Sequence, residues 1–254
     1  MDIQTHSIDG VLSIEFNRPQ KKNAITAAMY QALADAIKEA EADAAVRVVL
    51  ITGGAEIFTA GNDLEDFRHN PPQSGESPVF RFLYAISHMK KPLIAAVAGA
   101  AVGIGTTMLL HCDAVYAGDN AKFSLPFTAL GLCPEAASSL LLPALAGHLR
   151  ASEKLLFGEP FGAEEAREMG LVNRVLPAGE VASYAFERAR KLAQMPAASV
   201  RTTKALMRAG QLKAVEAQMA EEGAHFRKML GAPEAKEAFA AFFERRKPDF
   251  SKFA

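Results

Sequence analysis

Two stretches near the middle of the chain combine residue types that could do chemistry together. The first, residues 97–113, is an apolar strand and a glycine-rich turn, followed by a short predicted helix at 106–112. Such a turn leaves unpaired backbone N–H groups at a helix N-terminus, where negative charge is favoured. The second, residues 130–135, places the carboxylate of Glu135 among cysteine, proline and leucine side chains. Donors for an oxyanion and one poorly solvated base are the minimum for removing a proton next to a carbonyl group.

Length and composition limit the class of protein. The chain has 254 residues and a formal net charge of −1. This length suits one large domain or a core with an appendage, and the near-neutral charge argues against a nucleic-acid partner. Cys112 and Cys133 are too few for a disulfide framework and lack metal-type spacing, so we expect free thiols and no metal site. The N-terminus lacks a signal-peptide pattern and the apolar runs are short, which predicts a cytoplasmic protein without a membrane span.

The elements that must position these groups alternate between strands and helices as far as about residue 125. We expect a hairpin around Asp9-Gly10, a helix capped by Thr26 and a buried strand at 46–52. This alternation is typical of a parallel sheet with crossover helices, an α/β fold. The proline-rich segment 69–78 is predicted to be a surface loop.

Beyond Glu135 the chain is predicted to be almost entirely helical. Pro196 ends one helix, and two or three amphipathic helices follow it. We therefore divide the chain into a core at 1–195 and a C-terminal helical region at 196–254. The apolar faces of that region should pack on its own core or on a neighbouring subunit.

Four stretches, taken in order, resemble the crotonase superfamily, which is the enoyl-CoA hydratase/isomerase family. Residues 17–25 are similar to its N-terminal signature, and residues 58–64 and 99–113 are similar to its two oxyanion-hole turns. Gly-Leu-Val at 170–172 and the Phe/Arg/Lys tail complete a resemblance that covers essentially the whole chain. It implies a spiral of ββα units with a C-terminal helical region that mediates trimerisation, and hence a homotrimer or hexamer.

The resemblance also implies an acyl-CoA thioester as the substrate, with no further cofactor. The thioester oxygen would accept hydrogen bonds from the backbone N–H groups of Asn62 and Ile104, which match the family's two donor positions. Cations in the loop after residue 17 and in the tail are candidates for the CoA phosphates, although such cations are often only solvated. The implied substrate contacts are Ala60, Gly61, Asp63, Leu64, Gly103, Phe127, Lys22 and Lys247, with Lys21 and Arg18 as further candidate cations.

Two departures from the family's hydratases indicate a different reaction. Hydratases carry one glutamate after the second turn and another directly after a proline, where this chain has Thr107 and Phe127. Glu135 after Pro134 resembles the single carboxylate of the Δ3,Δ2-enoyl-CoA isomerase branch, closest to its peroxisomal type. We expect Glu135 to remove a C2 proton from a 3-enoyl-CoA and to return it at C4, which gives the trans-2-enoyl-CoA.

Apolar neighbours should strengthen this base. Phe127, Leu132 and Cys133 would desolvate Glu135 and raise its pKa. Glu135 could instead be only an acid favoured by a helix N-terminus, and we expect Asp63 to cap a helix and Thr107 to pack within one. At the level of the whole protein, two alternatives stay open. One is a hydratase or another crotonase-type reaction, and the other is a non-catalytic acyl-CoA-binding protein.

Overall fold

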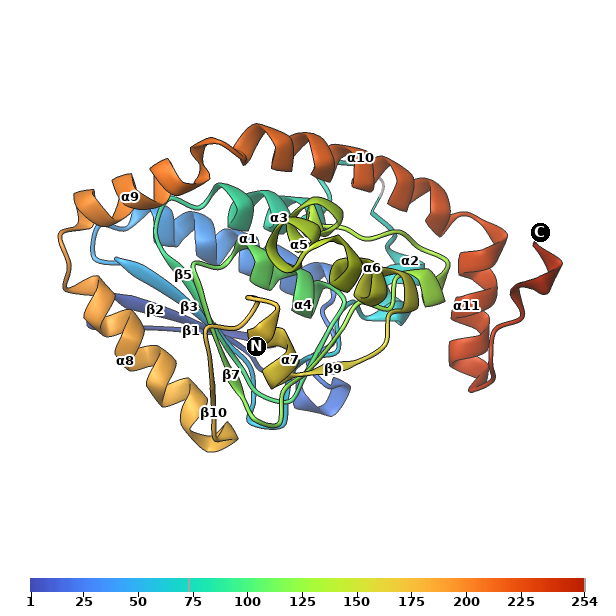
Figure 1. Cartoon of the computed structure of the whole chain (residues 1–254), viewed down its shortest axis with the longest axis horizontal. Helices are drawn as coiled ribbons and strands as arrows, with labels where there is room; N and C mark the ends of the chain where they lie inside the picture. The colour runs from blue at the N-terminus through green and yellow to red at the C-terminus, as the bar shows by residue number, and fades with distance from the viewer. Residues whose placement is uncertain (73, 254) are drawn as a thin grey trace.

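The larger of two sheets has six strands in a computed structural model that describes residues 1–72 and 74–253 (Figure 1). Its first two strands pair antiparallel and the others pair in parallel. In spatial order they are β1 (Ile3–Ile8), β2 (Val11–Phe16), β3 (Val48–Thr52), β5 (Leu93–Val97), β7 (Ala114–Gly118) and β10 (Arg174–Leu176). The expected hairpin is confirmed, because Asp9 and Gly10 adopt the positive φ values, 52° and 78°, that a tight turn between β1 and β2 requires.

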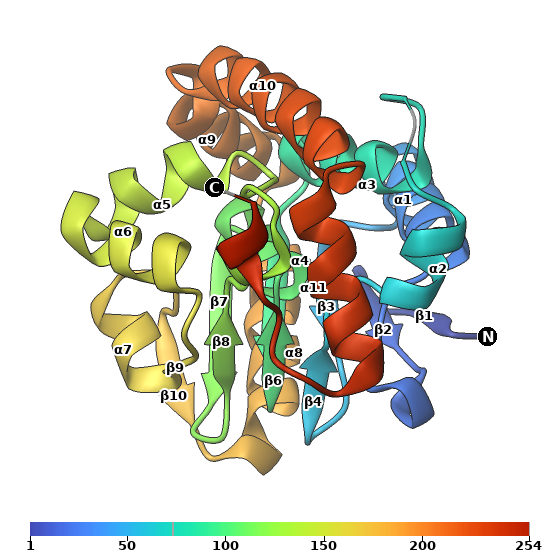
Figure 2. The ribbon, with the colours of Figure 1, turned by 90° about the vertical axis from the view of Figure 1, so that its right-hand side faces the viewer.

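A smaller sheet stands beside the ends of three of these strands (Figure 2). Its strands, in spatial order, are β4 (Ile57–Thr59), β6 (Ala100–Val102), β8 (Lys122–Ser124) and β9 (Phe161–Gly162). Each of β4, β6 and β8 directly follows β3, β5 or β7 in the chain, and helical segments return the chain to the larger sheet. This repeat confirms the spiral of ββα units.

Helices cover both faces of the larger sheet, which explains why its central strands are apolar throughout. On one face, Val48 and Leu50 pack with α8 (Val181–Ala193). On the other face, Val49 and Ile51 belong to the main core with α1 (Ala27–Ala42) and α3 (Pro78–His88). The predicted cap is confirmed, because the Thr26 hydroxyl accepts a hydrogen bond from Met29 N at the start of α1.

The second half of the chain is helical, as expected. Three helices follow β8, namely α5 (Ser138–Ala146), α6 (His148–Phe157) and α7 (Ala163–Glu168). After Pro196 come α9 (Ala197–Ala209), α10 (Leu212–Leu230) and α11 (Pro233–Glu244), and α10 passes over α3 and α5 (Figures 1 and 2). Within the described ranges, no helix combines the length and hydropathy needed to cross a membrane.

Three predicted boundaries differ from the structure. The helix expected at 106–112 begins two residues earlier, as α4 (Ile104–Thr107), and tightens into a 3₁₀ helix at Met108–His111. The strand expected at 46–52 begins only at Val48, because Val46 N still bonds back to Asp43 O in the preceding turn. The loop at 69–78 is shorter than predicted, since α2 (Leu64–His69) runs into it and Pro78 starts α3; Gln73 lies outside the described residues.

Candidate active site

The two glycine-rich turns lie against each other, and two glycines make this contact possible. Gly61 has φ 83°, and a Cβ added to it would lie 2.6 Å from Val102 O and 3.9 Å from Gly103 N. A Cβ added to Gly105 would lie 2.6 Å from Cγ2 of Thr59. The two distances of 2.6 Å are shorter than real Cβ contacts, so any larger residue at Gly61 or Gly105 would push the turns apart.

Each turn presents one backbone N–H that the fold leaves free. Neighbouring amides are already hydrogen-bonded within the fold, since Asp63 N donates to Ile25 O and Thr107 N donates to Gly103 O. Within residues 1–72 and 74–253, Asn62 N and Ile104 N donate to no other backbone or side-chain group. Ile104 is the first residue of α4, where an unpaired N–H and the helix dipole favour an anion. These are the two donors expected from the sequence.

The residues around the first turn are tied to it by polar contacts. Asp63 accepts hydrogen bonds from Glu65 N and Asp66 N, which confirms it as the cap of α2. The same carboxylate forms an ion pair with Arg18 at 2.7 Å. The guanidinium of Arg18, a candidate for binding the CoA phosphates, is therefore already paired within the fold. The Lys22 carbonyl accepts a hydrogen bond from Ala60 N at 3.0 Å, which places the Lys22 loop beside the turn.

Of the other candidate substrate contacts, Leu64 and Gly103 lie at the two turns, whereas Lys247 lies on the segment after α11. Leu64 opens α2 directly after the first turn, and Gly103 has open space where a Cβ would stand. Lys247 lies on the exposed segment after α11, and no hydrogen bond or ion pair of the described residues joins it to either turn. Binding of the CoA phosphates by Lys22 and binding by Lys247 therefore stay two separate predictions.

Glu135 is buried, and only one of its two carboxyl oxygens has a described hydrogen-bond partner. Only 8% of the residue is exposed, and the Thr107 hydroxyl donates a hydrogen bond to its Oε1. In the part of the chain that the structure describes, Oε2 has no hydrogen-bond partner. Thr107 is therefore more than the packing residue expected from the sequence, since it holds one oxygen of the carboxyl and leaves the other available.

Burial raises the pKa of Glu135 to about 8, and the nearby carboxylate of Glu222 adds to this shift. The hydrogen bond from Thr107 acts in the opposite direction, because it stabilises the charged form. A carboxyl with a pKa near neutrality is well matched to removing and returning a proton. The predicted direction of the shift is thus confirmed.

Asn62 and Glu135 line the same small cavity, of about 20 Å³. Its apolar wall comes from α2, α3 and α10, with Phe67, Phe80, Leu83, Met219 and Phe226 among the lining residues. Phe127, Leu132 and Cys133 do not line this cavity as described, but they pack in the same apolar core as Ala136, the residue after Glu135. Most of the apolar lining of the cavity therefore comes from helices distant in sequence from Glu135.

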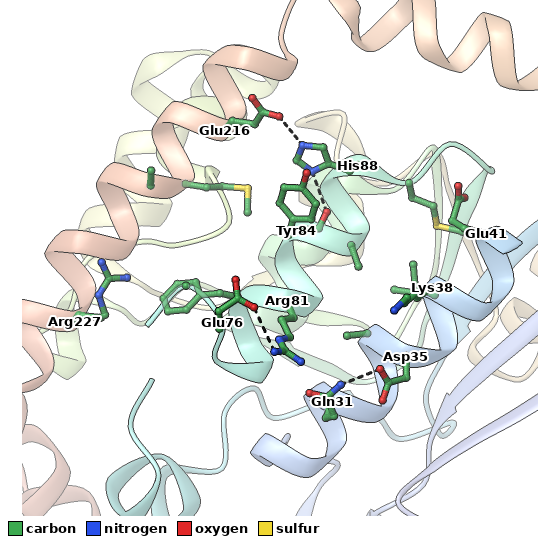
Figure 3. A pocket seen from close by; sticks show the side chains of 18 residues that line it. Gln31, Asp35, Lys38, Glu41, Glu76, Arg81, Tyr84, His88, Glu216 and Arg227 are labelled. Carbon is green, nitrogen blue, oxygen red and sulfur yellow. Dashed lines mark hydrogen bonds and ion pairs between the residues drawn. The ribbon is translucent and has the colours of Figure 1, made fainter. Parts of the chain in front are cut away.

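A much larger groove of about 940 Å³ begins on the other side of Phe80 and Met219, which line both spaces (Figure 3). It runs between α1, α3 and α10, with apolar side chains such as Ile37 and Met89 along it. Paired polar groups lie at its edges, including His88 and Glu216 at 2.6 Å (Figure 3). Drug-sized ligands occupy sites of about 300–1,000 Å³, so this groove has room for a long acyl chain.

Tyr30 is a site residue that the sequence did not reveal. Its hydroxyl donates a hydrogen bond to Oδ1 of Asn62 at 2.5 Å, and its ring packs on Phe82. Burial raises the pKa of Tyr30 well above its usual value, and the charge of Glu135 adds to the shift. The only available signal is that a tyrosine within the apolar face of a helix needs a partner for its hydroxyl.

Both the sequence and the fold of this chain match those of known proteins. The sequence profile of the enoyl-CoA hydratase/isomerase family matches residues 6–252. The chain belongs to this family. A solved enoyl-CoA hydratase/isomerase from Pseudoalteromonas atlantica T6c is 43% identical, with a TM-score of 0.94 over 99% of this chain and 100% of that one. The crotonase-like fold implied by the resemblance is confirmed.

Family members with different named activities are similarly close to this chain. Enoyl-CoA delta isomerase 2 from Rattus norvegicus is 37% identical over 93% of the chain, which spans 62% of that relative's length. The 2,3-dehydroadipyl-CoA hydratase of Escherichia coli (strain K12) is 34% identical over 94% of both chains. Membership of the enoyl-CoA hydratase/isomerase family therefore leaves the reaction to be argued from the site.

Among the described residues, no group of three or more His, Cys, Asp or Glu side chains is placed to hold a metal ion. The arrangement offers two backbone donors and one protonatable carboxyl, which together suffice to stabilise an enolate and to move a proton.

Proposed function

We propose that this chain is an acyl-CoA isomerase that converts a 3-enoyl-CoA into the trans-2-enoyl-CoA. The single observation that supports this proposal is the environment of Glu135. It is a buried carboxyl with one oxygen that no described group hydrogen-bonds, and it is the carboxyl that shares a cavity with the predicted oxyanion donor Asn62. A double-bond shift needs one acid–base group and no water, which is what an apolar cavity with one carboxyl can supply.

In this mechanism the thioester oxygen lies between Asn62 N–H and Ile104 N–H. Oε2 of Glu135 takes a proton from C2, and the electron pair of that C–H bond enters the conjugated dienolate. Negative charge then builds on the thioester oxygen, where each backbone donor is worth about 3–4 kcal/mol in comparable sites. Oε2 returns the proton to C4, so atoms and charge balance and Glu135 ends as it began.

A hydratase is the second candidate, and the named activity of the E. coli relative supports considering it. Water addition by two carboxyls would need a second acid near Glu135. Thr107 and Phe127 occupy the positions where the family's hydratases carry glutamates. Glu222 is the nearest other buried carboxylate, but its oxygens accept hydrogen bonds from Ala137 and Ser139. The isomerase is therefore the better supported proposal.

The groove in Figure 3 extends the proposal to the substrate. We place the far end of the acyl chain between α1, α3 and α10, beyond Phe80 and Met219. Lys22 and Lys247 remain the proposed partners of the CoA phosphates, with no cofactor besides the CoA thioester itself. A homotrimer or hexamer, a cytoplasmic location and the division at residue 195 also remain proposals.

Turnover of a medium-chain trans-3-enoyl-CoA tests the proposal, followed through the absorbance of the conjugated thioester. Wild type and Glu135→Gln should be compared, with hydration of a 2-enoyl-CoA measured alongside. We expect at least about a hundredfold loss of isomerisation in the variant, at the low end for general acid–base catalysis. Intact hydration without isomerisation in wild type would contradict the isomerase, and unchanged turnover in Glu135→Gln would move the base elsewhere.

A further inference from the structure

A second buried carboxylate, Glu222 of α10, holds the backbone directly after Glu135. The residue is only 5% exposed, although its side chain is ionisable. Its Oε2 accepts a hydrogen bond from Ala137 N at 2.6 Å, and its Oε1 accepts from Ser139 N at 3.0 Å and from the Ser139 hydroxyl at 2.5 Å. All three donors lie within four residues of Glu135.

The segment that Glu222 holds has a backbone conformation that its own residues disfavour. Ala136 and Ala137 have φ values of 60° and 54°, in the left-handed region that disfavours residues with a Cβ. Ala137 also precedes α5 and has no polar atom in its side chain to cap that helix. Glu222 therefore supplies from α10 the cap that the loop lacks.

Other contacts from the same helix reach both sides of Glu135. Before it, Cys133 Sγ donates to the Glu222 carbonyl at 3.6 Å. After it, Gln218 Nε2 donates to the Ser139 hydroxyl at 2.9 Å. Farther along, α10 is joined to α3 by the pair of His88 and Glu216 (Figure 3). The loop of Glu135 is thus attached to a helix of the C-terminal region rather than to the sheet.

We propose that Glu222 is a positioning residue of Glu135, because its carboxylate fixes the backbone at 137–139 and so complements the hydrogen bond by which Thr107 orients the Glu135 side chain. This inference rests on the proposed role of Glu135 as the base. Glu222 itself faces the N–H groups of α5 and takes no part in the proton transfer.

The charge of Glu222 gives this role a measurable signature. Besides Glu222, the titratable groups near Glu135 are Tyr30 from α1, Cys133 from its own loop and His111, which bonds to Ala136 O. Burial raises the pKa of Cys133 to about 11 and lowers that of His111 to about 4, so both are neutral around pH 8. Tyr30, whose pKa is also raised, is neutral there as well.

Among these described groups, Glu222 is therefore the one that can place a negative charge near Glu135 in this pH range. Burial raises the pKa of Glu222, but its three hydrogen-bond partners all donate to it and favour the ionised form. Removing this charge should make Glu135 easier to ionise. A residue with a merely structural role would not move that ionisation.

The test compares Glu222→Gln with Glu221→Gln, an exposed acid one position earlier on the same helix that pairs with His225. Two quantities are measured against pH in each variant. One is kcat/KM for isomerisation, and the other is the carboxyl ¹³C signal of Glu135, assigned through its loss in Glu135→Gln. Glu222→Gln should lower kcat on the high-pH plateau by about tenfold to a hundredfold, the cost of a misplaced reacting group, with a smaller change in KM.

In the same variant, the acid limb of kcat/KM and the midpoint of the ¹³C titration should both move to lower pH. Glu221→Gln should match wild type in both. If Glu222→Gln fails to fold, Ser139→Ala removes one of the three donors at a half-buried position, and it should lower plateau kcat in the same direction. Unchanged kcat in Ser139→Ala, or profiles of Glu222→Gln that coincide with those of Glu221→Gln, would overturn the positioning role.

The ¹³C titration separates this inference from the proposed reaction. A wild type that does not isomerise, together with a midpoint that moves only in Glu222→Gln, would contradict the isomerase while supporting the link between the two carboxyls. A wild type that isomerises, with a midpoint that does not respond to Glu222→Gln, would support the isomerase and overturn the link.

Discussion

The hydroxyl of Thr107 donates a hydrogen bond to Oε1 of Glu135, a residue 28 positions later in the chain. Thr107 ends α4, the helix whose first residue, Ile104, offers one of the two free N–H groups. One short helix therefore contributes both to the predicted oxyanion hole and to the orientation of the predicted base. The contact also opposes the effect of burial on the pKa of Glu135.

Replacing this hydroxyl should raise the pKa of Glu135 further. Thr107→Val keeps the shape of the side chain but removes a hydrogen bond to the charged form, worth about 1.5–3 kcal/mol, or roughly one to two pKa units. The acid limb of kcat/KM should move to higher pH. Thr128→Val, which changes an exposed threonine bonded to Leu156 O, serves as the control. An acid limb that stays in place would contradict the role given to Thr107.

The ionisation of Glu135 should also affect the stability of the folded chain. Because its pKa is about 8 in the fold and 4.5 in the reference state, the folded chain keeps a proton that the unfolded chain has released. The stability from this group is complete below about pH 4.5 and is lost as the pH rises through about 8. Glu135→Gln should therefore be more stable than wild type at about pH 9, by an upper bound on the order of 3–5 kcal/mol.

Urea unfolding at several pH values measures this difference. The free energies of unfolding of the two proteins should converge towards about pH 4, where the carboxyl is protonated in both states. A difference that stays constant across this range would show that the substitution acts through packing and not through ionisation.

Tyr30→Phe tests whether the side chain of Asn62 must be held. The ring and its packing on Phe82 are kept, while the hydrogen bond to Asn62 is lost. Loss of one such bond costs about 1–3 kcal/mol when a polar partner is left behind, so we expect kcat/KM to fall by about tenfold. Tyr184→Phe on α8 is the matched control, and equal effects of the two substitutions would exclude a special role for Tyr30.

Gly61→Ala tests the contact between the two turns. The added methyl would lie 2.6 Å from Val102 O on a backbone with φ 83°, so the turns must separate. We expect a loss of about 1–3 kcal/mol in the free energy of unfolding, together with weaker turnover. Gly179→Ala meets no atom within 4 Å and should be nearly neutral. Retention of wild-type stability and turnover in Gly61→Ala would contradict the close contact.

Met219→Ala should change the preference for acyl-chain length. Met219 lines both the cavity of Glu135 and the larger groove, so a shorter side chain widens the connection between them. The ratio of kcat/KM for long and short 3-enoyl-CoA substrates should rise relative to wild type. Met207→Ala, at a 67% exposed position on α9, is the control. An unchanged ratio in Met219→Ala would place the acyl chain elsewhere.

Much of the architecture is predictable from the sequence, since its signals are local. The Asp9-Gly10 turn, the caps at Thr26 and Asp63 and the apolar strands depend on neighbouring residues, and the structure confirms them. The two glycine-rich turns are also apparent from the sequence, because glycine adopts such backbone conformations without the steric cost of a Cβ. Glu135 stood out as a lone carboxyl in an apolar segment.

What only the tertiary structure decided is which side chains surround these groups. Thr107, Tyr30 and Glu222 reach their partners across 28, 32 and 85 positions of the chain. Most of the apolar wall of the cavity comes from α2, α3 and α10, and Ala136 is the one sequence neighbour of Glu135 in the described lining. Contacts of this kind form when helices pack on the sheet, and neither residue type nor periodicity specifies which faces will meet. The sequence thus determined the turns and the position of the predicted base, whereas packing determined the direction in which its pKa shifts and the helix that bonds to its loop.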